Sequence, residues 1–188
     1  MAILAPRTRI AIFVMSLEQD IGQKDFHSEY HKAVLNILHT HYFLVDQMND
    51  LFKKYDITRQ QYNVLRILRG QLPGSASVNL IRDRMLDKMS DASRIVERLR
   101  IKEYVTRDYS ENDKRRVDVT ITTKGLDLLN TMQADVDDFI KVMNNLSEPE
   151  TKLLNELLDK VRAGRSATGS TDHPDSEEKI TTLASLKI

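Results

Sequence analysis

The fold is decided by residues 90–125, which read SDASRIVERLRIKEYVTRDYSENDKRRVDVTITTKG. The first part of this stretch has apolar residues three and four positions apart, the spacing that lines one face of a helix. These residues are Ala92, Ile95, Val96 and Leu99. The opposite face is polar and partly basic, and it consists of Ser90, Ser93, Arg94, Glu97 and Arg98. The sequence therefore predicts a helix over residues 90–102 that buries one face and exposes cations on the other.

After Lys102 the pattern changes from helical spacing to strict alternation, which is typical of half-buried strands. The side chains that share one side of a first strand are Val105, Arg107 and Tyr109, and those of a second strand are Val117, Val119 and Ile121. Residues 110–116 between them form a polar loop that ends in Lys114, Arg115 and Arg116. We therefore expect a two-stranded hairpin with a cationic tip.

Helices are predicted on both sides of this stretch. Apolar residues at helical spacing indicate one long helix over residues 26–55, and a capping box formed by Thr58 and Gln61 begins a second. Ser77 can cap a short third helix. Downstream, the same spacing predicts a long helix over residues 124–144, and a last helix follows the capping box of Ser147 and Glu150.

This order of elements is that of a winged helix-turn-helix. We predict a mainly α (α+β) fold, with the winged helix-turn-helix at residues 57–123 and a wing sheet of two or three strands. Long N- and C-terminal helices at residues 26–56 and 124–163 carry apolar stripes that the small core cannot cover, which predicts dimerisation through them. Residues 1–25 are expected to be an N-terminal extension, and the polar residues 164–188 a disordered tail.

The charge distribution favours a nucleic-acid partner, although the whole chain has 28 basic and 28 acidic residues and no net charge. Residues 82–124 contain twelve basic and nine acidic residues, so the basic excess is confined to the predicted winged segment. In winged helix-turn-helix geometry the helix over residues 90–102 lies in the major groove. Lys114, Arg115 and Arg116 then reach the backbone or a narrow minor groove. Double-stranded DNA is therefore the expected partner.

Composition also limits chemistry and location. Cysteine is absent, which excludes disulfides, thiolate metal sites and thiol-based catalysis. The apolar residues 10–17 are too few to span a bilayer and no small-residue cleavage site follows them, so we expect a cytoplasmic protein without membrane contact. The sequence has no Gly-x-Ser-x-Gly motif and no glycine-rich phosphate loop, so we expect neither an enzyme nor a cofactor.

Residues 30–161 resemble the MarR (multiple antibiotic resistance) family of regulators. The motifs that carry the resemblance are SDASRIVERL in the helix, Asp113-Lys114-Arg115 in the loop, and an apolar-Thr-x-x-Gly signature at Ile121, Thr122 and Gly125. The resemblance implies a homodimer on a palindromic DNA site, in which Asp113 orients Arg115 toward the minor groove. The DNA contacts of the helix that it implies are Ser90, Ser93, Arg94 and Arg98.

The resemblance also implies a small aromatic effector, held between the long first helix, the second helix and the helix over residues 124–144.

One position departs from the family, which often has glycine where this chain has Glu103. A left-handed turn there would cost a glutamate roughly 1 kcal/mol or more. We therefore expect the helix before Glu103 to end differently.

Other hypotheses stay open at this stage. His27 and His31 lie one turn apart, with His39 and His41 further along the same helix, so a pair with a carboxylate could hold a regulatory zinc ion. His41 falls on the apolar stripe, where a structural histidine is the commoner outcome. A winged helix that docks a protein instead of DNA is a further class. Finally, Arg94 and Arg98 could simply pair with Glu97 or Asp91 on the surface.

Overall fold

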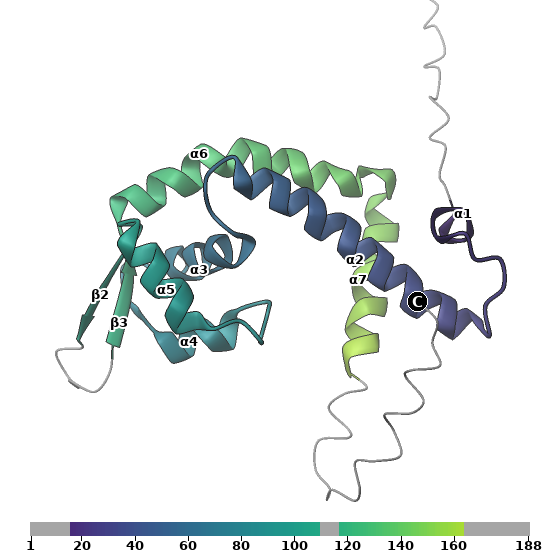
Figure 1. Ribbon diagram of the computed structural model, residues 1–188, viewed down its shortest axis with the longest axis horizontal. Helices are drawn as coiled ribbons and strands as arrows, with labels where there is room; N and C mark the ends of the chain where they lie inside the picture. Colours follow the sequence, from purple (N-terminus) through teal and green to yellow (C-terminus); the bar gives the residue numbers. More distant parts are fainter. Residues whose placement is uncertain (1–15, 110–116, 164–188) are drawn as a thin grey trace, which may run out of the picture. The chain divides into compact units, whose positions relative to one another are not determined.

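The computed structural model describes residues 16–109 and 117–163 (Figure 1). The expectations for the first 15 residues and for the tail after residue 163 lie outside this range. The elements in chain order are α1 (Leu17–Ile21), α2 (Glu29–Lys53), α3 (Arg59–Arg69), β1 (Ala76–Ser77), α4 (Val78–Arg84), α5 (Ala92–Ile101), β2 (Val105–Tyr109), β3 (Val117–Ile121), α6 (Thr123–Ile140), the 3-10 helix η1 (Lys141–Asn145) and α7 (Glu148–Ala163). The chain divides into two compact units, Met1–Phe139 and Ile140–Ile188. This mainly helical architecture with a small sheet confirms the predicted fold class.

Polar side chains begin α3 and α4 at the positions that the sequence predicted. The Thr58 hydroxyl accepts a hydrogen bond from the backbone N–H of Gln61 at 3.2 Å, and the Gln61 side chain accepts one from the N–H of Thr58 at 2.9 Å. The Ser77 hydroxyl accepts one from the N–H of Leu80 at 3.2 Å. These caps satisfy N–H groups that have no partner within the first helical turn.

Helix α5 begins later than predicted. Its N-cap is Asp91, whose carboxylate accepts a hydrogen bond from the backbone N–H of Arg94 at 3.1 Å. Aspartate caps a helix as well as serine does, and its charge complements the positive end of the helix dipole. Ser90 therefore lies before the helix, and the prediction that its side chain belongs to the outer helical face is wrong.

The sheet has three antiparallel strands in the order β1-β3-β2. Strands β2 and β3 are paired along their whole length, from Val105 opposite Ile121 to Tyr109 opposite Val117. This confirms the predicted hairpin. The short strand β1 adds Ala76 opposite Val119, which fastens the start of α4 to the sheet.

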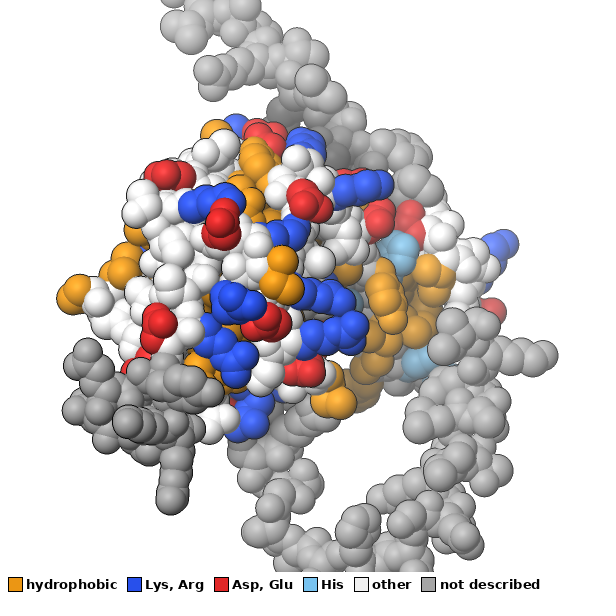
Figure 2. Space-filling view, turned by 60° about the vertical axis from the view of Figure 1, so that its left-hand side comes forward, with side chains coloured by type: hydrophobic (Ala, Val, Ile, Leu, Met, Phe, Trp, Pro, Cys, Tyr) orange, Lys and Arg blue, Asp and Glu red, His pale blue; other side chains and the backbone are white. Residues whose placement is uncertain are grey.

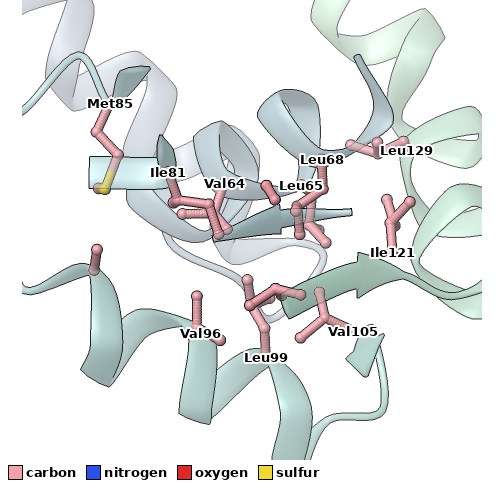
Figure 3. Close-up of a cluster of buried hydrophobic side chains, with 13 residues drawn as sticks. Val64, Leu65, Leu68, Ile81, Met85, Val96, Leu99, Val105, Ile121 and Leu129 are labelled. Atoms are coloured by element: carbon pink, nitrogen blue, oxygen red, sulfur yellow. The ribbon is translucent and has the colours of Figure 1, made fainter. Parts of the chain in front are cut away.

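The main core lies between α3, α4, α5 and the sheet (Figure 3). Its fully buried side chains come from every one of these elements: Val64, Leu65, Leu68, Ile81, Val96, Leu99 and Val119. The apolar stripe predicted for α5 is thus buried at Ala92, Val96 and Leu99. Because burying one large aliphatic side chain contributes about 1.5–3 kcal/mol, this core holds α5 firmly against the rest of the unit.

A second cluster joins the end of α2 to α6. It consists of Leu51, Phe52, Ile57 and Met132, all buried. The ring of Phe52 also stacks on that of Tyr62 in α3, with 4.6 Å between their centroids. The C-terminal end of α2 is therefore part of the same packed unit as the winged helix.

The turn after α5 takes the left-handed conformation, contrary to the expectation of a different helix end. Glu103 has φ of 63°, its carbonyl accepts a hydrogen bond from the Thr122 hydroxyl at 2.8 Å, and its carboxylate lies 2.7 Å from the Lys124 ammonium. Helix α6 packs so closely on this turn that a Cβ on Gly125 would lie 2.4 Å from the carbonyl oxygen of Tyr104. Thr122 and Gly125 of the Thr-x-x-Gly signature therefore contact the residues just before β2, and these contacts join the two outer ends of the hairpin.

The first half of α2 differs from its end, because its large apolar side chains are exposed. They are Tyr30, Val34, Ile37, Leu38, Tyr42 and Phe43. His41 is exposed as well, so its placement on a core stripe is wrong for the single chain. In the second unit, α7 exposes Leu153, Leu157 and Val161. Both helices thus carry apolar surface at positions where the sequence predicted dimerisation.

Candidate nucleic-acid interface

The outer face of α5 presents the side chains of Ser93, Arg94 and Arg98 to solvent. The two arginines lie four residues apart, one helical turn, so they are neighbours on one face. Within residues 16–109 and 117–163, no ion pair involves either guanidinium, and the surface pairing with Glu97 or Asp91 that the sequence left open is not formed. These two charges are therefore available for an anionic partner.

Ser90, a predicted DNA contact, lies in the turn before α5. Its hydroxyl donates a hydrogen bond to the Asp87 carboxylate at 2.8 Å, and the backbone N–H of Met89 donates to the same carboxylate at 3.1 Å. These two hydrogen bonds lower the pKa of Asp87 from its ordinary value. The backbone N–H of Leu86 donates to the Asn63 side chain of α3 at 3.0 Å. Ser90 thus belongs to the framework of the turn between α4 and α5.

Glu97 binds two arginines that sequence reasoning did not select. Its carboxylate accepts hydrogen bonds from the Arg100 guanidinium at 2.8–3.3 Å, and Arg107 on β2 lies 3.6 Å away. Hydrogen bonding to Arg100 is the main reason that the pKa of Glu97 is lowered. All three side chains are partly exposed, so the cluster contributes little to stability. It does hold Arg100 and Arg107 at the junction of helix and hairpin.

The wing residues singled out from the sequence lie outside the described residues. They are Asp113, Lys114, Arg115 and Arg116. Tyr109 and Val117, the described residues on either side of this segment, pair with each other at the end of the β2-β3 ladder. Figure 2 brings forward the side of the molecule that carries α5 and the sheet, and there Lys and Arg side chains gather with acidic side chains between them.

A cleft of roughly 550 Å³ lies between the end of α2, the start of α3 and the end of α5. Its apolar lining includes Phe52, Ile57 and Ile101. Its charged lining includes Lys53, Arg59, Arg98 and Lys102, together with Asp56, whose carboxylate is 2.8 Å from the Lys102 ammonium. The resemblance placed an effector against α2, α3 and α6. The cleft described here has α5 as its third wall, and the effector position that the resemblance implies stays a prediction.

His27, which precedes α2, and the histidines of α2 do not assemble a metal site in the described part of the chain. The rings of His27 and His31 are 5.5 Å apart, and His39 lies 3.4 Å from the Asp20 carboxylate of α1. No group of three or more His, Asp or Glu side chains in residues 16–109 and 117–163 is arranged to hold an ion. None of the helices described combines the length and apolarity that crossing a bilayer requires.

A short helix, a tight turn, an exposed basic helix and an antiparallel hairpin define a winged helix-turn-helix protein. The chain is 31% identical over 120 residues to the HTH-type transcriptional regulator MhqR of Bacillus subtilis, an overlap of 62% of this chain and 79% of MhqR. It is also 31% identical over 113 residues to the regulator MgrA of Staphylococcus aureus, covering 60% of this chain and 75% of MgrA. The protein belongs to the MarR family of winged-helix transcriptional regulators.

Solved structures agree with this assignment. A mutant Escherichia coli MarR in complex with operator DNA is 26% identical, with a TM-score of 0.63 over 73% of this chain and 99% of that one. A MarR-like regulator from Bacillus cereus has the same fold at 23% identity, with a TM-score of 0.64 over 72% of this chain and 97% of that one. No family model matches the chain. The matched proteins are transcription regulators, and no catalytic family is indicated.

Proposed function

We propose that the protein is a homodimer that binds a specific double-stranded DNA sequence and regulates transcription from it. Helix α5 enters the major groove, and residues 110–116 contact the backbone or the minor groove. The observation that carries the proposal is the outer face of α5, where Arg94 and Arg98 are exposed while the opposite face is buried in the core. A rigid helix with free guanidinium groups is the arrangement that reads guanine edges and phosphates.

Arg94 and Arg98 are proposed to make different contacts. Arg94 is the third residue of α5, and in helix-turn-helix proteins the N-terminal residues of the recognition helix contact base edges. Arg98 lies one turn further and lines the cleft beside α2 and α3, so we assign it to a phosphate. Ser93 flanks Arg94 on the exposed side. Ser90 stays a predicted contact, and because its hydroxyl already donates to Asp87, it would accept a hydrogen bond from the DNA.

The dimer is proposed to form through α2 and α7. Each of these helices exposes large apolar side chains, with Tyr42 of α2 67% and Val161 of α7 66% exposed in the single chain. Exposed stripes of this kind mark an interface, and a second copy covers them under two-fold symmetry. Two α5 helices related by that axis would read a palindrome whose half-sites are about 34 Å apart.

A ligand that controls DNA binding is proposed to occupy the cleft between α2, α3 and α5. Apolar walls at Phe52 and Ile101 beside the cations of Arg98 and Lys102 suit a small aromatic anion, such as a carboxylate or a phenolate. Arg98 lines the cleft and also lies on the exposed face of α5. An anion bound in the cleft would therefore pair with the Arg98 guanidinium and compete with the DNA phosphate for it. The ligand would then favour the released form.

Selection of bound duplexes from a random pool by the full-length protein tests the function. We expect a palindromic consensus with half-sites one helical turn apart. Recovery of no preferred duplex would overturn sequence-specific binding and favour a winged helix that docks a protein.

The double variant Arg115→Ala with Arg116→Ala tests the wing on the selected duplex. We expect weaker binding to every sequence and a salt slope shallower by about one unit per lost phosphate contact. An unchanged slope would remove the wing from the interface.

A further inference from the structure

The turn between α4 and α5 exposes two large apolar side chains. Met89 is 94% exposed and Leu86 is 86% exposed. By contrast, Met85, only four residues before Met89, is 2% exposed in the core. Because the Met89 side chain is almost fully exposed, it contributes almost no packing energy to its own chain, and it is accessible to a partner.

The backbone that carries Met89 is held in place. The N–H of Met89 itself donates to the Asp87 carboxylate at 3.1 Å, and the Ser90 hydroxyl donates to the same carboxylate at 2.8 Å. Gln60 and Arg59, at the start of α3, favour the charged form of Asp87 and so help to lower its pKa. Three residues before Met89, the N–H of Leu86 donates to the Asn63 side chain of α3 at 3.0 Å. The turn is therefore fastened to α3, and it presents Met89 at a defined place.

The surroundings of Met89 identify the chemistry of its partner. Met89 lies two residues before the N-cap Asp91, at the end of α5 from which Ser93 and Arg94 project. Lys88 precedes it, with its ammonium donating to the carbonyl of Asp83, and the carboxylates of Asp87 and Asp91 on either side are occupied by hydrogen bonds of the turn and of the helix cap. With α5 in the major groove, an exposed apolar side chain at this end of the helix faces the edges of the bases. In the major groove of DNA the apolar group on the base edges is the C5 methyl of thymine, with phosphates on either side.

We propose that Met89 is a specificity-determining residue that packs against a thymine methyl group in each half-site. The inference rests on the proposed function, because it requires α5 to lie in the major groove. The unbranched, polarisable side chain of methionine adapts to such a contact without a preformed pocket. Arg94 and Met89 then read neighbouring bases by different means, one through hydrogen bonds and the other through an apolar contact.

Deoxyuridine, which lacks only the C5 methyl, tests this contact directly. Each thymine of the selected duplex is replaced in turn by deoxyuridine, symmetrically in both half-sites, and the affinity of the full-length protein is measured by fluorescence anisotropy. At one thymine position we expect the wild type to bind about fourfold more weakly per half-site, the effect of one buried methyl-sized group. Met89→Ala should bind the thymine duplex more weakly by a similar factor and should lose nothing further on the deoxyuridine duplex.

The matched control is Leu72→Ala, at an exposed leucine in the loop after α3. It should keep the thymine preference of the wild type, while Met89→Leu should keep most of it. Wild-type protein that is indifferent to deoxyuridine at every position would overturn this inference but not the proposed function. So would a Met89→Ala variant with the wild-type thymine preference. If the wild type selects no duplex at all, both proposals fail. Because Met89 is exposed, thermal melts of the variants should match the wild type.

Discussion

The two ends of α2 show how one helix serves two kinds of packing. At the C-terminal end, Leu51 and Phe52 are buried against α3 and α6 within the same chain. At the other end, apolar side chains of similar size, such as Tyr30 and Leu38, are exposed. The difference shows that the spacing of apolar residues alone does not tell whether an apolar helix face packs within its own chain or against another molecule. The winged unit obtains its stability from its own core, whereas the N-terminal half of α2 has the apolar surface that the proposed dimer would cover.

The largest expected effect separates these two kinds of packing. Leu99→Ala removes a fully buried side chain from the core beside α5 and should lower the free energy of unfolding by about 2–5 kcal/mol. The matched change Leu38→Ala, on the exposed part of α2, should leave the packing of the winged unit intact and instead weaken dimerisation. Chemical denaturation measures the first effect, and sedimentation over a concentration series measures the second. Equal losses of stability that do not depend on protein concentration would contradict the distinction.

Gly125→Ala should have the next largest effect. Its new Cβ would meet the carbonyl oxygen of Tyr104 and the side chain of Ile121, so α6 must move away from the hairpin at a cost of about 1–3 kcal/mol. The control is Gly74→Ala, where the nearest atom to a new Cβ is 3.2 Å away. If thermal denaturation gave the two variants the same melting temperature, the close approach of α6 would not be a constraint.

Asp87→Ala should have a smaller effect that depends on pH. Removing the carboxylate takes away the partner of Ser90 and of the Met89 N–H, which should cost about 1 kcal/mol near neutral pH. Since the pKa of Asp87 is lowered in the folded state, its contribution is complete above its ordinary value of 3.8 and is lost as the pH falls through the lowered value. The difference in unfolding free energy between the wild type and the variant should therefore shrink below about pH 4. A difference that stays constant down to pH 2 would show that the charge is not involved.

Glu103→Gly should have the smallest effect, and in the opposite direction. Glycine adopts the left-handed conformation of this position without steric cost, so the variant should gain up to about 1 kcal/mol, reduced by loss of the exposed pair with Lys124. Lys124→Ala provides the control for that pair alone. Urea denaturation at neutral pH measures both, and a less stable Glu103→Gly variant would mean that the ion pair outweighs the strain.

Features set by neighbouring residues were predictable from the sequence, and features set by distant ones were not. The caps at Thr58 and Ser77 and the alternation of β2 and β3 depend on local spacing, and the structure confirms them. The start of α5 was misplaced because Asp91 and Ser90 are both good caps, and only the contact with Asp87 distinguishes them.

The parts of the site that sequence reasoning missed are formed by segments far apart in the chain. The cleft takes its walls from residues 49–61 and 98–102, and Glu97 pairs with Arg107 across the end of α5. No local pattern connects these positions. His41 was misplaced for a related reason, because a single sequence does not distinguish a stripe that faces its own core from one that faces another copy.

The most direct test of the central claim is the ratio of affinities for the selected duplex and for an unrelated duplex, measured for the wild type and for Arg94→Ala at one salt concentration. Lys152→Ala on α7 serves as a control that removes one exposed cation far along the chain from α5. If Arg94 reads a base edge, its loss should cost about 1–3 kcal/mol per half-site on the selected duplex and much less on the unrelated one. Equal weakening on both duplexes would contradict base recognition by the exposed face of α5.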